Sequence, residues 1–358
     1  MGRQLKQQEV EFAVHGGSIY AAAGKRWREL GRQLGLAAIK TGRVELVPLD
    51  SLSSEACVAT INLIGQGSSA SAWDAVGGDA RQAIRLLQDT LKETVHGVVA
   101  EQNSNPFSGW LGAAASGGKL VDGVSLLQAN PEEGEAHSSG PVATGDLPRI
   151  QSAVGGSRTN QRYLELVARS HNAKIAAILR SAAELSGGFI ASCHTPLRAR
   201  HLREQMLPGS ISRAITLGEA IFRARRRGVN AIVDTLVSRT QGELLAQGRV
   251  TDISLKRDQA ANMGGYLVLQ QGQTSLRLHL HHGAVVTLSR QETTRSALPG
   301  EMVLLDRQGE SIGADEIRQG DVLYLLHLPH QSQSAAHQVW LPMSPVSRAA
   351  HGYYAMAG

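Results

Sequence analysis

Residues 57–64 read CVATINLI, and residues 65–69, which follow directly, read GQGSS. An almost unbroken apolar run of this length is typical of a strand that is buried on both faces of a sheet. The polar, glycine-rich pentapeptide after it is typical of a loop at the carboxyl end of such a strand. This strand and its loop predict the centre of a layered α/β domain.

The order of strand, polar loop and helix repeats on the C-terminal side of this unit. The repeating segments are an amphipathic helix at 78–94, an apolar strand at 95–100, a small-residue helix at 109–116 and a strand at 119–123. A further short strand is predicted at 44–49 on the N-terminal side. The repeat predicts a three-layer α/β sandwich, in which ligands bind beyond the carboxyl ends of the strands.

The first forty residues suggest one more unit of the same kind. Residues 11–14, EFAV, predict a strand, residues 15–18, HGGS, a tight turn, and residues 19–36 a helix with a basic face. Further along, residues 130–160 are rich in Gly, Ser and Pro and predict a loop, while residues 161–185 have the periodicity of a long helix. Residues 187–192 then predict a strand and 210–227 a helix.

After about residue 235 the pattern changes to short alternating segments separated by Gly, Gln and Asp. They lie at 248–256, 264–270, 275–281, 284–288, 302–305 and 321–326. This pattern predicts a β-rich second domain, built as a barrel or a sandwich. We therefore expect an α/β domain with the ligand cleft at 1–235, a β-rich domain at 236–345, and a C-terminal tail at 346–358 that packs back on the α/β domain.

Composition excludes several classes of protein. The chain has 358 residues, of which 42% are hydrophobic and 19% charged, so the bulk of it is not disordered. No apolar run reaches the roughly 18 residues that a membrane-spanning helix needs, and the N-terminus has no apolar core of the secretory type. Two cysteines, Cys57 and Cys193, cannot form a disulfide framework. We expect a cytoplasmic protein that does not enter a membrane.

The charge of the chain is modest for its length. The formal net charge is +5, aromatic residues make up 4% of the chain, and no zinc-finger, RNA-recognition or helix-turn-helix signature is present. We therefore do not expect nucleic-acid binding. Arg223 and residues 225–227 end a predicted helix, where cations complement the negative end of the helix dipole.

The segment of His15, Gly16, Gly17 and Ser18 is the first candidate for a functional site. A glycine turn before a helix can present backbone N–H groups to an anion or a carbonyl oxygen. The alternative is a tight turn that simply requires glycine. Gln66, in the loop after the central strand, is expected to join the same ligand-binding end of the sheet.

Asp122 ends a predicted strand in an apolar, glycine-rich setting. Its carboxylate is suited to binding substrate or to acting as a general base; the alternative is a cap of the following loop. Glu101, Asn103 and Asn105 bring acceptors and amide donors onto one loop, which suits recognition of a ring amide. For this loop the alternative is capping of the helix that follows.

Cys193 and His194 follow a predicted strand, and a thiolate beside an imidazole is a nucleophile. Adjacent residues point in opposite directions on an extended chain, however, so each needs a partner elsewhere or is structural. Cys57, inside a buried strand, is expected to serve packing. His279 and His281 share one face of a predicted strand, but no companion ligand is spaced suitably, so we expect no metal site.

Several segments resemble the S-methyl-thiohydantoin desulfurase domain family, whose members are often encoded near or fused to hydantoinase/oxoprolinase-type proteins. The best block is LPGSISRAI at 207–215, and a second runs from VDG at 121–123 to QANPE at 128–132. The HGGS segment lies where relatives carry a longer glycine run. GRVTD at 248–252 and GDV at 320–322 are similar to segments of the family's β domain.

The resemblance implies the same two-domain fold and a hydrolase-like enzyme acting on a cyclic amide, hydantoin or thiohydantoin. It adds Glu132 to the substrate-binding residues and strengthens the assignment of Asp122. Three positions depart from the family pattern, at Val124, Gln128 and Asn130. These departures favour the alternative of a non-catalytic partner of a hydantoinase/oxoprolinase-type protein. We expect a small-molecule substrate and a homo-oligomer, and the sequence indicates no particular cofactor.

Overall fold

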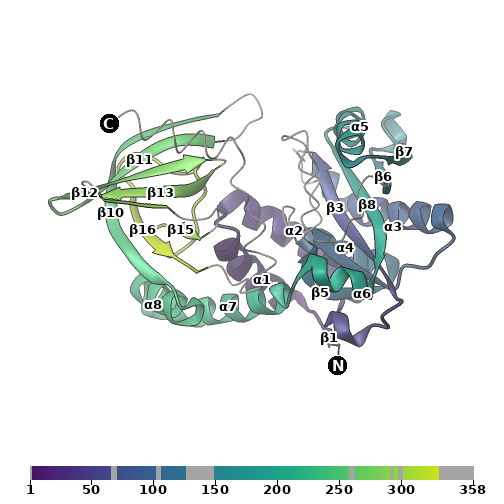
Figure 1. Ribbon diagram of the computed structural model, residues 1–358, viewed down its shortest axis with the longest axis horizontal. Helices are drawn as coiled ribbons and strands as arrows, with labels where there is room; N and C mark the ends of the chain where they lie inside the picture. Colours follow the sequence, from purple (N-terminus) through teal and green to yellow (C-terminus); the bar gives the residue numbers. More distant parts are fainter. Residues whose placement is uncertain are drawn as a thin grey trace.

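The computed structural model describes residues 2–65, 71–101, 106–125, 149–257, 263–281, 283–290, 293–296 and 301–329. Within these ranges the chain forms a mixed α/β domain and a curled antiparallel sheet, joined by a pair of helices (Figure 1). The predicted combination of an α/β domain with a β-rich domain is thereby confirmed. No helix in the described ranges is long and apolar enough to cross a membrane.

The sheet of the α/β domain has, among the described residues, nine strands in the order β1-β2-β5-β4-β3-β8-β6-β7, with β9 paired to β5. Their bounds are β1 Arg3–Gln4, β2 Glu45–Val47, β3 Cys57–Gly65, β4 Gly97–Glu101, β5 Lys119–Ser125, β6 Arg149–Gly155, β7 Leu164–Ser170, β8 Phe189–Arg198 and β9 Met206–Pro208. Strands β2 to β5 run parallel, whereas β8 is antiparallel to β3 and to β6. The apolar run that opened the sequence analysis is the central strand β3.

Helices cover both faces of this sheet and make three layers. On one face, Ile61 and Cys193 pack in a core with residues of α3 (Ser71–Leu91) and α4 (Phe107–Ser116). On the other face, α5 (Asn172–Leu185) packs on the β6 side, while α6 (Ala199–Leu202) packs over β3, β4 and β5. The 3-10 helices are η1 Leu49–Ser51, η2 Arg158–Asn160, η3 Arg203–Gln205 and η4 Arg225–Arg227.

The first twenty residues correct the sequence prediction. Residues 11–18 are neither strand nor turn, because they lie inside helix α1 (Gln7–Tyr20), which is followed by α2 (Lys25–Thr41). The glycines allow α1 to approach α7 (Ser210–Ala224): a Cβ on Gly16 would lie 1.9 Å from the carbonyl oxygen of Ala214. Likewise, a Cβ on Gly218 would lie 1.8 Å from the carbonyl oxygen of Phe12. Glycine therefore serves helix packing here and not a tight turn.

A second correction concerns the segment predicted as a loop and one long helix. Residues 149–155 form β6, and residues 164–170 form β7 before α5 begins at Asn172. In β7, half-buried and exposed residues alternate, so its apolar positions satisfy the period of a strand as well as that of a helix. Pairing with β6 along seven residues decides between the two.

The second domain is an antiparallel sheet in the order β14-β13-β12-β11-β10-β16-β15 within the described ranges, and it curls around its own core (Figure 1). Its strands are β10 Glu243–Arg257, β11 Met263–Gln271, β12 Thr274–His281, β13 Ala284–Arg290, β14 Thr293–Ser296, β15 Met302–Leu305 and β16 Val322–His327. Helices α7 and α8 (Val229–Thr240) pack against β15 and β16 through a shared apolar cluster that includes Leu217, Leu236 and Leu326. This cluster joins the two domains.

Candidate functional site

A group of polar side chains lies on the face of the first sheet that α5 and α6 cover. Its members are half-buried Asn62 of β3 and the buried residues Glu101 of β4, Gln151 of β6, and Ser192 and His194 of β8. In β3, the apolar residues on either side of this group belong to different clusters, Val58 to the one under α6 and Ile64 to the one against α5. The group, called the polar cluster below, therefore interrupts an otherwise apolar face.

Strand register brings these side chains together. Asn62 is paired with Ser192 across β3 and β8, and His194 lies between Thr60 of β3 and Gln151 of β6. Because side chains two residues apart share a face of a sheet, Ser192 and His194 point to the same side. Polar residues at alternate positions on neighbouring strands thus form one continuous patch.

Hydrogen bonds connect the polar cluster. The Asn62 amide donates to Oε2 of Glu101, and this oxygen is 4.0 Å from Nε2 of His194. The amide nitrogen of Gln151 lies 2.9 Å from the same imidazole nitrogen and 2.6 Å from Oγ of Ser192. Since an amide nitrogen can only donate, Nε2 of His194 is the acceptor and the ring carries its proton on Nδ1.

The electrostatic surroundings keep His194 neutral. Burial lowers the pKa of His194 to about 4, and the positive charge of Arg149 adds to the effect. Burial also lowers the pKa of Arg149, while the charge of Glu101 acts in the opposite direction. At neutral pH the cluster therefore combines an unprotonated imidazole with a carboxyl group, two side-chain amides and a guanidinium group. These groups can accept a proton and can hydrogen-bond the N–H and C=O groups of an amide ring.

Cys193 and His194 lie on opposite faces of β8. Cys193 is fully buried in the core formed with α3 and α4, and burial raises the pKa of its thiol far above the ordinary value. A thiol in such surroundings is not ionised at neutral pH and is a poor nucleophile. The structure thus separates these two predicted catalytic residues and brings His194 together with Glu101 instead.

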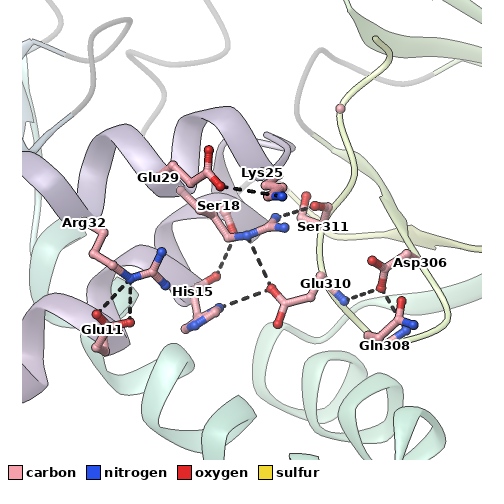
Figure 2. Close-up of polar contacts among 12 residues, drawn as sticks. Glu11, His15, Ser18, Lys25, Glu29, Arg32, Asp306, Gln308, Glu310 and Ser311 are labelled. Atoms are coloured by element: carbon pink, nitrogen blue, oxygen red, sulfur yellow. Dashed lines mark hydrogen bonds and ion pairs between the residues drawn. The ribbon is translucent and has the colours of Figure 1, made fainter. Parts of the chain in front are cut away.

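His15 lies at the contact between the two domains (Figure 2). Its Nδ1 is 3.2 Å from Oε2 of Glu310, which lies between β15 and β16, and 3.0 Å from Nη2 of Arg225. Arg28 reaches the same carboxylate at 3.4 Å. Burial lowers the pKa of His15 to about 4, and the nearby guanidinium groups add to this. Because Arg28 and Arg225 already compensate the charge of Glu310, its carboxylate does not reverse the effect.

The predicted anion cradle of His15, Gly16, Gly17 and Ser18 is therefore not formed. Gly16 and Gly17 lie in the C-terminal half of α1, where backbone N–H groups bond within the helix. The hydroxyl of Ser18 donates to the carbonyl oxygen of His15 at 2.9 Å. The expectation that His15 follows a strand is wrong, because this segment belongs to a helix of the domain contact.

Asp122 lies in β5 and holds the start of α7. Its Oδ1 accepts the backbone N–H of Ser212 at 3.0 Å, and its Oδ2 accepts the Ser212 hydroxyl at 2.6 Å. The backbone N–H of Gly209 also donates to the carbonyl oxygen of Asp122, at 2.8 Å. This arrangement caps a helix from a neighbouring strand; a catalytic role for Asp122 stays a prediction. The remaining predicted site residues, Gln66, Asn103, Asn105 and Glu132, lie outside the described residues.

Sequence reasoning missed Asn62, Arg149, Gln151 and Ser192. A usable signal was present in β3, where Thr60 and Asn62 are polar residues at alternate positions of an otherwise apolar strand. A groove of about 490 Å³ between α7 and α8 contains none of the predicted residues and is lined in part by Arg223, Arg227 and Arg239. The polar cluster is therefore the best candidate site in the described part of the chain.

The fold defines a class of protein in which a three-layer α/β domain carries a curled antiparallel sheet. Within this class, residues 170–340 match the family model described as S-Me-THD-like, C-terminal domain. Through this segment the chain is similar to the S-Me-THD-like family, and the resemblance seen in the sequence is confirmed. The matched segment includes β8 with His194 and the whole of the described second sheet.

A solved structure shares the fold over nearly the whole chain. The crystal structure of a protein from Chromobacterium violaceum, a structural genomics target, covers 98% of this chain and 98% of its own, with a TM-score of 0.66 and 16% identity. At that identity the likeness concerns the fold alone. No curated protein is significantly similar to the sequence.

Proposed function

We propose that the protein is a hydrolase-like enzyme that acts on a small cyclic amide of the hydantoin or thiohydantoin type, and that the polar cluster is its reaction centre. The observation that carries the proposal is the pairing of buried Glu101 with neutral His194, surrounded by the amides of Asn62 and Gln151. The match of residues 170–340 to the S-Me-THD-like C-terminal domain supports the choice of substrate class.

The groups of the cluster suit the edge of such a ring. A hydantoin edge alternates N–H donors with C=O acceptors, and the Glu101 carboxylate accepts from a ring N–H while the amide nitrogen of Asn62 or Gln151 donates to a ring carbonyl. A ring without an amide group would leave the carboxylate and the side-chain amides of the cluster without hydrogen-bond partners, which is costly in a buried site. Recognition would therefore select against rings that lack the amide.

We assign His194 the transfer of a proton from the attacking water to the leaving group. Its neutral imidazole exchanges the hydrogen bond from Gln151 for one from water and accepts a proton as the water oxygen bonds to the ring carbon. When the C–N bond breaks, or the C–S bond of an S-methyl substituent, the departing nitrogen or sulfur takes that proton back. Water is thus added across the broken bond. Arg149 and the amide donors stabilise the charge that develops on the ring oxygen.

The alternative is a non-catalytic partner of a hydantoinase/oxoprolinase-type protein. The contacts of Asp122 favour this alternative, because its carboxylate is engaged by Ser212 and the next acidic position of the family pattern is Val124. In that case the polar cluster would have no catalytic role and would contribute only to the fold.

One experiment distinguishes the hydrolase-like enzyme from the non-catalytic partner. The full chain is incubated with hydantoin and with an S-methyl-thiohydantoin, and ring opening and thiol release are followed by mass spectrometry and a thiol-reactive dye. We expect turnover that falls by roughly 100-fold or more in Glu101→Gln and in His194→Asn, the usual scale for a general acid–base group. Exposed His201→Gln is the matched control. Absence of turnover in the parent protein, together with co-purification with a hydantoinase-type protein, would establish the alternative.

A further inference from the structure

Strand β7 leaves one edge of the first sheet open within the described part of the chain. It runs for seven residues, Leu164–Ser170, and pairs with β6 alone, without a bulge or register shift. The opposite edge is β1, which has only two residues. Edge strands are usually protected by shortness, proline, a bulge or charged side chains; β7 lacks the first three, and its two charges, Glu165 and Arg169, are of opposite sign. A regular edge with balanced charges is suited to pairing with another strand.

The exposed residues of β7 are complementary to themselves. Glu165, Val167 and Arg169 alternate along the exposed face, with the acid and the base at equal distances from the valine. If two copies of β7 pair antiparallel with Val167 opposite Val167, each Glu165 lies opposite an Arg169 of the other copy. Opposite charges at directly facing positions stabilise an antiparallel pair. Within its own chain Glu165 is contacted by Tyr163 and by the exposed Arg158.

Exposed apolar side chains gather in the same part of the molecule. Val167 is 41% exposed, and Ile178 and Leu185 of the adjoining helix α5 are 47% and 69% exposed. Only two other large hydrophobic residues in the described ranges are so exposed, Phe222 and Leu244. Ile178 and Leu185 are seven residues apart and share one side of α5, which packs on Leu164 and Leu166 of β7.

We propose that β7 is the interface of a symmetric dimer, in which a second copy of this chain adds its own β7 antiparallel about a twofold axis at Val167. The two nine-stranded sheets would then form one continuous sheet. A twofold axis perpendicular to the sheet keeps the two α5 helices on the same face, so that Ile178 and Leu185 of each copy can pack across the axis. Such an isologous contact uses the same surface of both partners.

The register makes the proposal specific enough to test by charge reversal. Glu165→Lys alone, or Arg169→Glu alone, places like charges opposite each other at two symmetric positions. We expect either variant to raise the dissociation constant of the dimer by at least 10-fold in analytical ultracentrifugation of the full chain. The double variant restores opposite charges and should restore dimerisation. A double variant as weak as the single ones, with unchanged circular dichroism, would overturn the register.

Cross-linking gives an independent measurement. Val167→Cys places two thiols at directly facing positions of an antiparallel pair, within the range that a disulfide spans. With diamide as the oxidant we expect rapid formation of a covalent dimer, whereas Leu244→Cys, an equally exposed position on β10, should react slowly. The two native cysteines are buried and do not interfere. A parent protein that stays monomeric at all concentrations, or equal rates for the two variants, would overturn the proposal.

Discussion

In the folded protein His194 is neutral at pH values at which the same side chain carries a positive charge in the unfolded chain. Its pKa is about 4 in the folded protein, against 6.5 for an unperturbed histidine. Between these two values the unfolded chain binds a proton that the folded chain does not. The free energy of unfolding therefore falls as the pH is lowered from 6.5 to about 4, and the contribution is complete above 6.5.

A substitution isolates this contribution. His194→Gln keeps a polar side chain in the polar cluster but removes the proton uptake of the unfolded chain. We expect its free energy of unfolding to depend less steeply on pH between 6.5 and 4, by up to about 1.4 kcal/mol per pH unit. Asp79, whose pKa burial raises to about 6, acts in the opposite direction, so the comparison is between variant and parent.

Urea titrations at several pH values measure these slopes, with exposed His201→Gln as the matched control. Equal slopes for His194→Gln and the parent would show that the imidazole binds protons equally in the folded and the unfolded chain. In that case burial in the polar cluster would not lower the pKa of His194.

At the scale of single elements, the start of α7 depends on a residue far away in the sequence. The helix begins after Gly209, which has φ of +71° and no side chain to cap the first turn. Asp122 of β5 supplies the missing acceptors to Ser212. A carboxylate at this position also complements the positive end of the helix dipole. The cap thus ties strand β5 to the helix that leads to the second domain.

Removal of this cap should lower stability. We expect Asp122→Ala to reduce the free energy of unfolding by about 1–2 kcal/mol, the usual cost of losing a helix cap. Asp122→Asn keeps one of the two acceptors and should cost about half as much, because one hydrogen bond and the charge are lost but the other hydrogen bond remains. Thermal denaturation measures both, and exposed Asp252→Ala is the control. A variant that melts like the parent but loses turnover would instead support the predicted catalytic role of Asp122.

Some elements could be predicted from the sequence because their signals are local. The second sheet matches its prediction closely, since alternation along each strand encodes both the strand and its buried face. Helix α1 could not be predicted in this way. Phe12, Val14 and Gly16 are all buried because α1 packs against α2 and α7, so no amphipathic period marks the helix.

The candidate site could be predicted only in part, because the proximity of its residues is not encoded by any local pattern. Glu101 and His194 were identified because each follows a predicted strand, although the structure places His194 within β8, and their proximity depends on the strand order β4-β3-β8. No local pattern encodes that order. Asn62 and Gln151 became visible only once the register placed them beside Glu101 and His194.

At the scale of the whole molecule, the two domains meet through an apolar cluster and through polar contacts in which Glu310 has a central place. Glu310 of the second domain contacts His15 (Figure 2), and it also contacts the guanidinium groups of Arg28 and Arg225. The carboxylate contacts the guanidinium groups of Arg28 and Arg225, which would otherwise repel each other. Its charge therefore holds together a part of the domain contact that the apolar cluster does not cover.

Replacement of this one charge should destabilise the whole protein. Glu310→Gln preserves shape but removes the carboxylate that contacts buried Arg28 and half-buried Arg225, which leaves only the charges of neighbouring acidic residues such as Asp306 to oppose their repulsion, so we expect the free energy of unfolding to fall by about 2–3 kcal/mol. Glu219→Gln, which breaks the exposed pair with Arg223, is the matched control and should cost less than about 0.5 kcal/mol. Denaturant unfolding measures both. If the repulsion is the cause, adding Arg225→Met to Glu310→Gln recovers part of the loss; a double variant less stable than the single one would show that packing of Arg225, and not its charge, stabilises the contact.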